Sequence, residues 1–196
     1  MQVSDKECYT MSTPFKTSVR HSGQVIRGLF LTDKTRTIAG RVWQLFSRFT
    51  WELPQTLVGL SFTLGRALAG GVDRVDALGG ITFATGPVKQ YGMGVSLGTF
   101  VDVWAADWMS EEKEGRITES QLFMHEFGHT ADSQRFGWAY LPVIGLSSLV
   151  SAMGKGDHSY YWTEIRANRH AKHYFSKNYN ITWEELCYPS TSKKEA

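Results

Sequence analysis

Two histidines that are four residues apart, His125 and His129, enclose Glu126 in the sequence His-Glu-Phe-Gly-His. On an α-helix, residues at this spacing project from nearly the same side, so both imidazoles can reach one metal ion. The carboxylate between them lies beside the ion without binding it, where it can take a proton from a metal-bound water. The pattern therefore predicts a zinc site with Glu126 as general base. The alternative is a surface helix with two solvated histidines.

A third ligand is expected from a second helix downstream. Glu164 and Asn168 are four residues apart in a stretch that we expect to be helical from about Ser159 to Lys177. Ala167 and Ala171 fall on the same side of this helix. Such small side chains would let the two helices approach closely, as sharing one ion requires.

Residues just before this second helix offer alternatives. His158 or Asp157 could supply the third ligand if the connecting loop folds back over the site. His158, Tyr160 and Tyr161 are also candidates to donate a hydrogen bond to the oxyanion that forms on an attacked carbonyl. Ordinary packing is the competing interpretation of each of these three residues, and the sequence leaves both open.

His-Glu-x-x-His followed by Glu-x-x-Ala-Asn resembles the gluzincins, zinc metallopeptidases whose third ligand is a Glu at the start of a Glu-x-x-x-Asp motif on a second helix. The resemblance implies that His125, His129 and Glu164 bind Zn²⁺, that Glu126 is the general base and that the substrate is a peptide or protein. Asn168 stands where the family has a carboxylate that orients a ligand histidine. An Asn carbonyl can accept the same hydrogen bond but brings no charge.

The resemblance covers roughly residues 118–176, and it implies a single zincin-like domain. More loosely, the stretch from His125 to Glu164 is similar to small bacterial metallopeptidase-like domains, some of which lie at the ends of polymorphic toxins. Two other function classes remain open. A zinc-bearing binding or structural module would hold metal without turnover, and a metal-free interaction domain would hold none.

The first ligand helix has a recognisable start. Thr118 to Gln121 has the form of a capping box, with Thr118 as the N-cap. Phe123 and Phe127 share one side of the expected helix, next to the stripe that carries the two histidines. Apolar neighbours on both flanks predict that this helix is buried.

A small sheet is expected before this helix. Ile81–Thr85 and Gly94–Trp104 are runs of β-branched and aromatic residues separated by glycines, so they are predicted to be strands that could form a hairpin. Gly94–Val103 is our candidate for an edge strand beside the metal, to which a substrate backbone could add. The competing interpretation is that its glycines only bend a hairpin.

The remaining segments complete an α+β domain. Ile38–Phe49 has the apolar spacing of a helix, and Pro54 fits the first turn of another. Two apolar stretches, Leu57–Gly70 and Trp138–Met153, are expected to be core helices rather than membrane spans. The second could instead wall the cleft or act as a lid. The expected organisation is a polar arm over residues 1–37 with a strand at Gln24–Leu31, a zincin-like domain over 38–188 and a flexible tail over 189–196.

Composition fits a globular domain of 196 residues with enough apolar material, 42%, for one core. The formal charge of +2 and the lack of dense basic runs argue against a nucleic-acid partner. Cys8 and Cys187 lack metal-binding spacing and a disulfide framework, which favours a reducing compartment. No secretory signal is visible over Met1–Thr13, so we expect a cytoplasmic location, with secretion by another route left open. The oligomeric state is not indicated.

Overall fold

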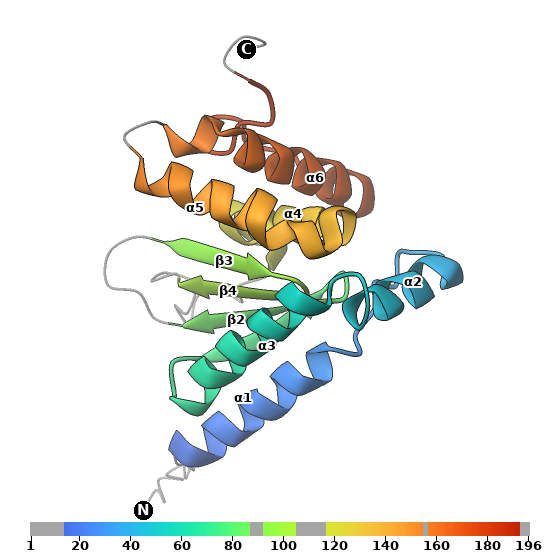
Figure 1. Cartoon of the computed structure of the whole chain (residues 1–196), viewed down its shortest axis with the longest axis vertical. Helices are drawn as coiled ribbons and strands as arrows, with labels where there is room; N and C mark the ends of the chain where they lie inside the picture. Colours follow the sequence, from blue (N-terminus) through green and yellow to red (C-terminus); the bar gives the residue numbers. More distant parts are fainter. Residues whose placement is uncertain (1–13, 87–91, 105–116, 155–156, 193–196) are drawn as a thin grey trace, which may run out of the picture.

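The computed structural model describes residues 14–86, 92–104, 117–154 and 157–192, so Met1–Thr13, which includes Cys8, lies outside it. The helices are α1 (Pro14–Gly28), α2 (Ile38–Arg48), α3 (Leu53–Leu68), α4 (Gln121–Phe136), α5 (Leu146–Met153) and α6 (Trp162–Tyr179). The strands are β1 (Arg74–Leu78), β2 (Ile81–Gly86), β3 (Met93–Leu97) and β4 (Phe100–Trp104). Figure 1 shows the sheet between α1 and α3 on one side and α4 and α6 on the other, which confirms the predicted α+β class.

The four strands form one mixed sheet in the order β1-β2-β4-β3. The predicted strand at Ile81–Thr85 is confirmed as β2, and it pairs in parallel with β4. The predicted strand Gly94–Trp104 is in fact two antiparallel strands, β3 and β4, joined through Gly98 with a φ of +63°. Of these two strands, β3 lies at an edge of the sheet and β4 lies inside it, so the predicted edge strand Gly94–Val103 is correct for its first half and wrong for its second.

Alternation along the strands builds a core on each face of the sheet. Phe83 and Val101 belong to the cluster that includes Phe123 of α4 and Phe175 of α6. Their neighbours Ala84 and Phe100 belong to a second cluster with Val25 of α1 and Ala67 of α3. The sheet is therefore sandwiched between helices, and the metal-motif helix packs against the side that carries the larger cluster.

The strand predicted at Gln24–Leu31 is wrong, because these residues end helix α1 and the turn after it. Val25 is fully buried against the sheet and α3, and the His21 ring bonds to the Val72 carbonyl oxygen. Packing of one helical face therefore outweighs the β-propensity of Val25 and Ile26. The part of residues 1–37 that the structure describes thus contributes to the body of the fold.

Both ligand helices begin later than predicted. A 3₁₀ turn at Ile117–Glu119 precedes α4, and Ser120 rather than Thr118 is its N-cap, without a side-chain capping bond. A second 3₁₀ turn, His158–Tyr160, precedes α6. Buried Ile117 holds the first of these turns against the core, so the expected capping box does not form.

The prediction of a core helix at Trp138–Met153 is wrong for most of this segment, of which Tyr140 and Ile144 are buried. Gly137, with a φ of +53°, ends α4, and a π-helical turn over Tyr140–Gly145 leads into α5. None of the residues of α5 is buried. This segment walls a cleft instead, which was the weaker of the two interpretations of its sequence.

The helical run Gln121–Met153, 33 residues in length, meets the length and composition of a membrane span, with 17% of its apolar window buried. Core helices of soluble proteins meet the same criteria, and this run changes direction at Gly137. The expectation that the chain has no transmembrane span therefore stays a prediction.

Candidate metal centre

The structure brings the three predicted ligands together between α4 and α6. Ligand atoms of His125, His129 and Glu164 all lie within 4.8 Å of one another, and all three residues are buried. The Nε2 atoms of His125 and His129 lie 3.2 Å and 3.3 Å from Oε2 of Glu164. In a tetrahedral zinc site with bonds of about 2.0–2.1 Å, two ligand atoms lie about 3.3 Å apart. The donor set and its spacing therefore fit a metal ion.

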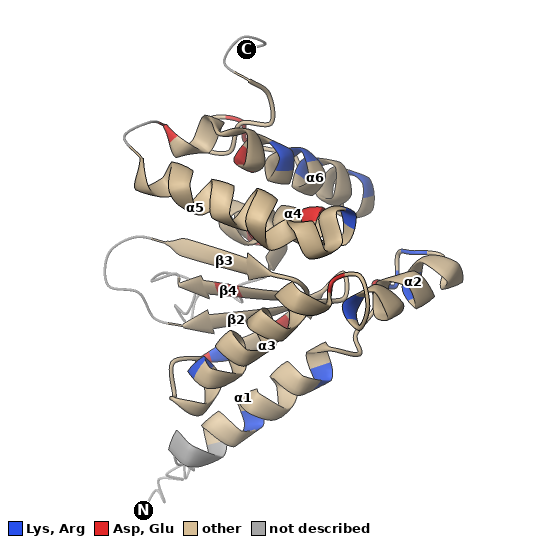
Figure 2. Cartoon of the chain, viewed as in Figure 1, with Lys and Arg blue, Asp and Glu red and all other residues tan. Residues whose placement is uncertain are grey.

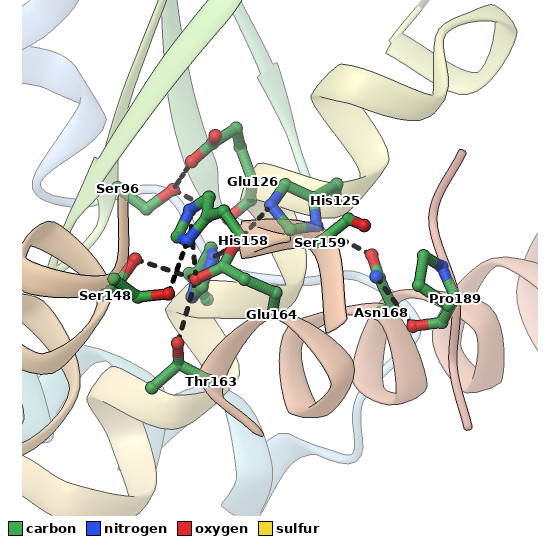
Figure 3. Close-up of polar contacts among 12 residues, drawn as sticks. Ser96, His125, Glu126, Ser148, His158, Ser159, Thr163, Glu164, Asn168 and Pro189 are labelled. Atoms are coloured by element: carbon green, nitrogen blue, oxygen red, sulfur yellow. Dashed lines mark hydrogen bonds and ion pairs between the residues drawn. The ribbon is translucent and has the colours of Figure 1, made fainter. Parts of the chain in front are cut away.

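Asn168 orients His125. Nδ1 of His125 lies 2.7 Å from Oδ1 of Asn168, and the amide nitrogen of Asn168 donates to the carbonyl oxygen of Pro189 at 2.9 Å (Figure 3). Because the nitrogen is engaged by Pro189, the amide oxygen must face the ring. His125 then carries its proton on Nδ1 and directs the Nε2 lone pair toward Glu164. The departure from the gluzincin carboxylate therefore leaves the orienting hydrogen bond intact.

The second carboxylate oxygen of Glu164 is also held. Ser148 of α5 donates to Oε1 at 2.7 Å, and the adjacent Thr163 hydroxyl donates at 2.9 Å. These bonds leave Oε2 directed at the two imidazoles. Burial alone would raise the pKa of the Glu164 carboxyl, but hydrogen bonds with His125 and His129 hold it well below its usual range.

His129 has the complementary shift. Burial would lower its pKa, but the hydrogen bond and charge of Glu164 outweigh burial and raise the pKa above its usual value. A proton therefore competes with a metal ion for the His129 ring as the solution becomes more acidic.

Glu126 lies beside the ligand group without belonging to it, as a general base must. Ser96 of β3 lies 2.6 Å from Oε2 of Glu126 and donates from its hydroxyl. Gly94 lies so close that a Cβ atom there would be 2.3 Å from Oε1 of Glu126. The edge strand thus packs directly on the carboxylate, and a side chain at position 94 would displace the Glu126 side chain.

The residues around the 3₁₀ turn His158–Tyr160 differ in their contacts with the ligand group. Nε2 of His158 lies 3.6 Å from Oε1 of Glu164, the oxygen turned away from the two other histidines, and His158 lines the cleft. Asp157 is engaged with Ser159, and the Tyr161 hydroxyl bonds to Ser147. Glu164 is therefore the third member of the ligand group, and of the predicted oxyanion donors only His158 faces the cleft; Tyr160 is not among the lining residues.

Tyr188 is a cleft residue that sequence reasoning missed. Its ring lies 5.3 Å from that of His125, and burial together with the charge of Glu126 raises its pKa to about 12. The hydroxyl therefore stays protonated and able to donate. No motif marks Tyr188, which the chain brings in from beyond α6.

The ligand group forms one wall of a cleft of about 760 Å³. β3 forms another wall along its whole length, and the segment from Tyr140 to Ala152 forms the side opposite. Most of the lining is apolar, including Met93, Val95, Leu97, Leu122, Leu141, Ile144, Leu146 and Leu149. Polar groups converge only around the metal site, as in a site that binds an extended, partly apolar ligand.

Close approach of α4 and α6 depends on Gly128, the fourth residue of the motif. A Cβ atom there would lie 2.0 Å from the carbonyl oxygen of Ala167, a backbone atom that cannot turn aside. We expect Gly128→Ala to destabilise the fold by about 1–3 kcal/mol or more, seen as a lower midpoint of thermal unfolding. Gly65→Ala on α3 is the matched control, because nothing lies within 4 Å of its Cβ position. Equal midpoints for the two variants would contradict this account of the helix contact.

Comparison with known proteins gives no match: no family model fits the sequence, and neither a curated protein nor a solved structure is similar to it.

Proposed function

We propose that this protein is a zinc-dependent peptidase in which His125, His129 and Glu164 bind the ion and Glu126 is the general base. One observation carries the proposal: three buried donor groups lie within 4.8 Å of one another, with Oε2 of Glu164 at 3.2 and 3.3 Å from the two imidazoles, beside a carboxylate outside the ligand group. When bound, zinc lowers the pKa of a coordinated water toward about 7 and polarises a carbonyl group.

The chain's own residues divide the remaining tasks. Ser96 engages Oε2 of Glu126, so Oε1 is the oxygen available to accept a proton from the attacking water and to return it to the leaving amine. Asn168 fixes His125, and Ser148 fixes Glu164. His158 and Tyr188 line the cleft and can donate to the oxyanion that develops on the attacked carbonyl.

A peptide is the substrate that best fits the cleft, because β3 offers an open sheet edge along it. The Tyr140 hydroxyl donates to the carbonyl oxygen of Ser96 at 2.8 Å, so that carbonyl points away from β4. In an antiparallel pair, backbone groups two residues apart point the same way, so those of Gly94 also face outward. Substrate addition is therefore expected beside Gly94, next to Glu126.

Elemental analysis and a peptide library test the proposal together. We expect about one zinc per chain after purification without chelators, an anomalous signal at the zinc edge between the three ligands, and cleavage of library peptides that stops on chelation. Stoichiometric metal with no cleavage of any peptide would support the second candidate, a zinc-bearing binding module. Absence of bound metal, together with failure to bind added zinc, would overturn both.

A further inference from the structure

Helix α2 has its polar side inward and its apolar side outward. Its buried residues are Gln44, Ser47 and Arg48. Its exposed residues include Ile38, Val42, Trp43 and Phe46, and its C-cap residue Phe49 is exposed as well. The exposed fractions of these five side chains run from 44% to 81%. A surface helix of a globular protein ordinarily has the opposite arrangement.

The inward polar side chains lock this orientation. The Arg48 guanidinium donates to the carbonyl oxygens of Leu29, Leu31 and Gly80 at 2.8, 2.5 and 2.5 Å. Gln44 donates to the carbonyl oxygen of Gly79 and accepts from the backbone N–H of Asp33. Turning α2 to hide its apolar side would leave these buried groups unpaired, which is unfavourable. The apolar side is therefore held in solvent by the fold.

Helix α3 repeats part of this arrangement, although its Leu60, Leu64 and Ala67 pack in the core. Its buried positions are Gln55, Thr56, Gly59, Thr63 and Ala67. Gln55 bonds to Ser133 and Gly137, and Thr63 bonds to Asp102. The exposed stripe is instead Leu53, Leu57, Val58 and Phe62. We call the exposed apolar side chains of α2 and α3, with Phe49 and Trp51 between the helices, the α2–α3 face.

The exposed charged side chains described on α1, α2 and the loop between them are all basic, and exposed Asp73 lies beyond α3 in the chain. Between residues 17 and 72 the acidic residues are Asp33 and Glu52, and each is only 2% exposed. Arg20, Arg27, Lys34 and Arg41 are exposed in the same stretch. Figure 2 shows basic residues on α1 and α2. The surface of this part of the described chain therefore combines large apolar groups with uncompensated positive charge.

We propose that the α2–α3 face docks on an anionic phospholipid bilayer, with both helices in the plane of the interface. Apolar side chains enter the boundary between head groups and acyl chains, and exposed cations pair with lipid phosphates. Trp43 and Trp51 are of the residue type that favours this boundary. At 11 and 16 residues, α2 and α3 are shorter than the roughly 20 residues that a span requires.

Charge favours a bilayer over a second copy of this chain. Two copies joined through the α2–α3 face would bring like cations together, whereas an anionic surface neutralises them. The ring of Trp51 contacts that of Trp138, at 6.3 Å between centroids, so the face adjoins the segment that walls the cleft. Docking of the α2–α3 face does not depend on the metal site, and vesicle binding is measured without any hydrolysis.

Sedimentation of the full chain with vesicles tests the proposal. We expect binding to vesicles of three parts phosphatidylcholine to one part phosphatidylglycerol, weaker binding in high salt, and a blue shift of tryptophan fluorescence. Trp43→Ser with Phe46→Ser should lower the partition coefficient by about tenfold or more, since two large apolar groups no longer enter the bilayer. Arg41→Gln should lower it by about fivefold. Leu186→Ser, at a position that is 92% exposed outside the face, is the control and should bind as the unchanged chain does.

Three results would overturn the proposal. One is failure to bind these vesicles, and another is equal binding by the double variant and the Leu186→Ser control. The third is a dimer in analytical ultracentrifugation that the double variant dissociates, without any vesicle binding. That result would assign the face to self-association. Circular dichroism of each variant checks that a loss of binding does not come from unfolding.

Discussion

Glu126→Gln is expected to remove peptide hydrolysis and to leave the metal bound. Gln has nearly the same shape as Glu and can still accept the hydrogen bond from Ser96, but it cannot take a proton from water. Loss of a general base lowers the rate by about 10²- to 10⁴-fold. The measurement is kcat/KM on a peptide that the unchanged chain cleaves, together with zinc content.

Glu184→Gln is the matched control, because Glu184 is exposed and lies outside the cleft lining. It should match the unchanged chain in both measurements. Full turnover by Glu126→Gln would exclude Glu126 as the base. Loss of zinc from Glu126→Gln would show instead that this residue supports the metal, and the assigned division between ligand and base would be incorrect.

Glu164→Ala is expected to have the largest effect on metal affinity, because it removes the ligand that joins α6 to the histidines of α4. Removing an orienting partner of a ligand lowers affinity by about 10- to 100-fold, and loss of the ligand itself should exceed that range. Asn168→Ala supplies the milder comparison, since it removes the hydrogen bonds to His125 and to the Pro189 carbonyl oxygen but no ligand. Competition with a chromophoric chelator measures both variants.

The pH dependence of zinc binding by the unchanged chain completes this test. Because the pKa of His129 is raised, its ring is still protonated at pH values above the usual imidazole pKa, and this proton competes with zinc. Zinc affinity should therefore rise as pH increases through neutrality. Zinc affinity that is the same for Glu164→Ala and the unchanged chain would place the third ligand elsewhere, with His158 as the nearest alternative. Calorimetric titration at several pH values would measure this dependence.

The ligand group could be predicted from the sequence because each half of it is local. His125 and His129 share a side of one helix, and Glu164 and Asn168 share a side of another, by the spacing of four residues alone. The structure adds what brings the halves together, namely the contact between Gly128 and Ala167. No rule of spacing predicts such a contact between helices.

Residues outside α4 and α6 that contact the ligand group or Glu126 could not be predicted from helical spacing. Ser96 arrives on the edge strand, Ser148 on α5 and Tyr188 from beyond α6, and each acts through a contact over a long sequence separation or without a motif. The role of Trp138–Met153 could not be predicted from its composition. A short apolar run has the same composition whether it fills a core or lines a cleft, and only its neighbours decide between the two.

The bond from Asn168 to the Pro189 carbonyl has a consequence for synthesis of the chain. The histidines of α4 leave the ribosome first, then Glu164, and only later the segment that fixes the Asn168 amide. A nascent chain that has reached Tyr179 therefore contains every proposed ligand and Asn168 itself, but lacks the carbonyl group that fixes the Asn168 amide. The orientation of Asn168 beside His125 therefore depends on a residue that is synthesised after every proposed ligand.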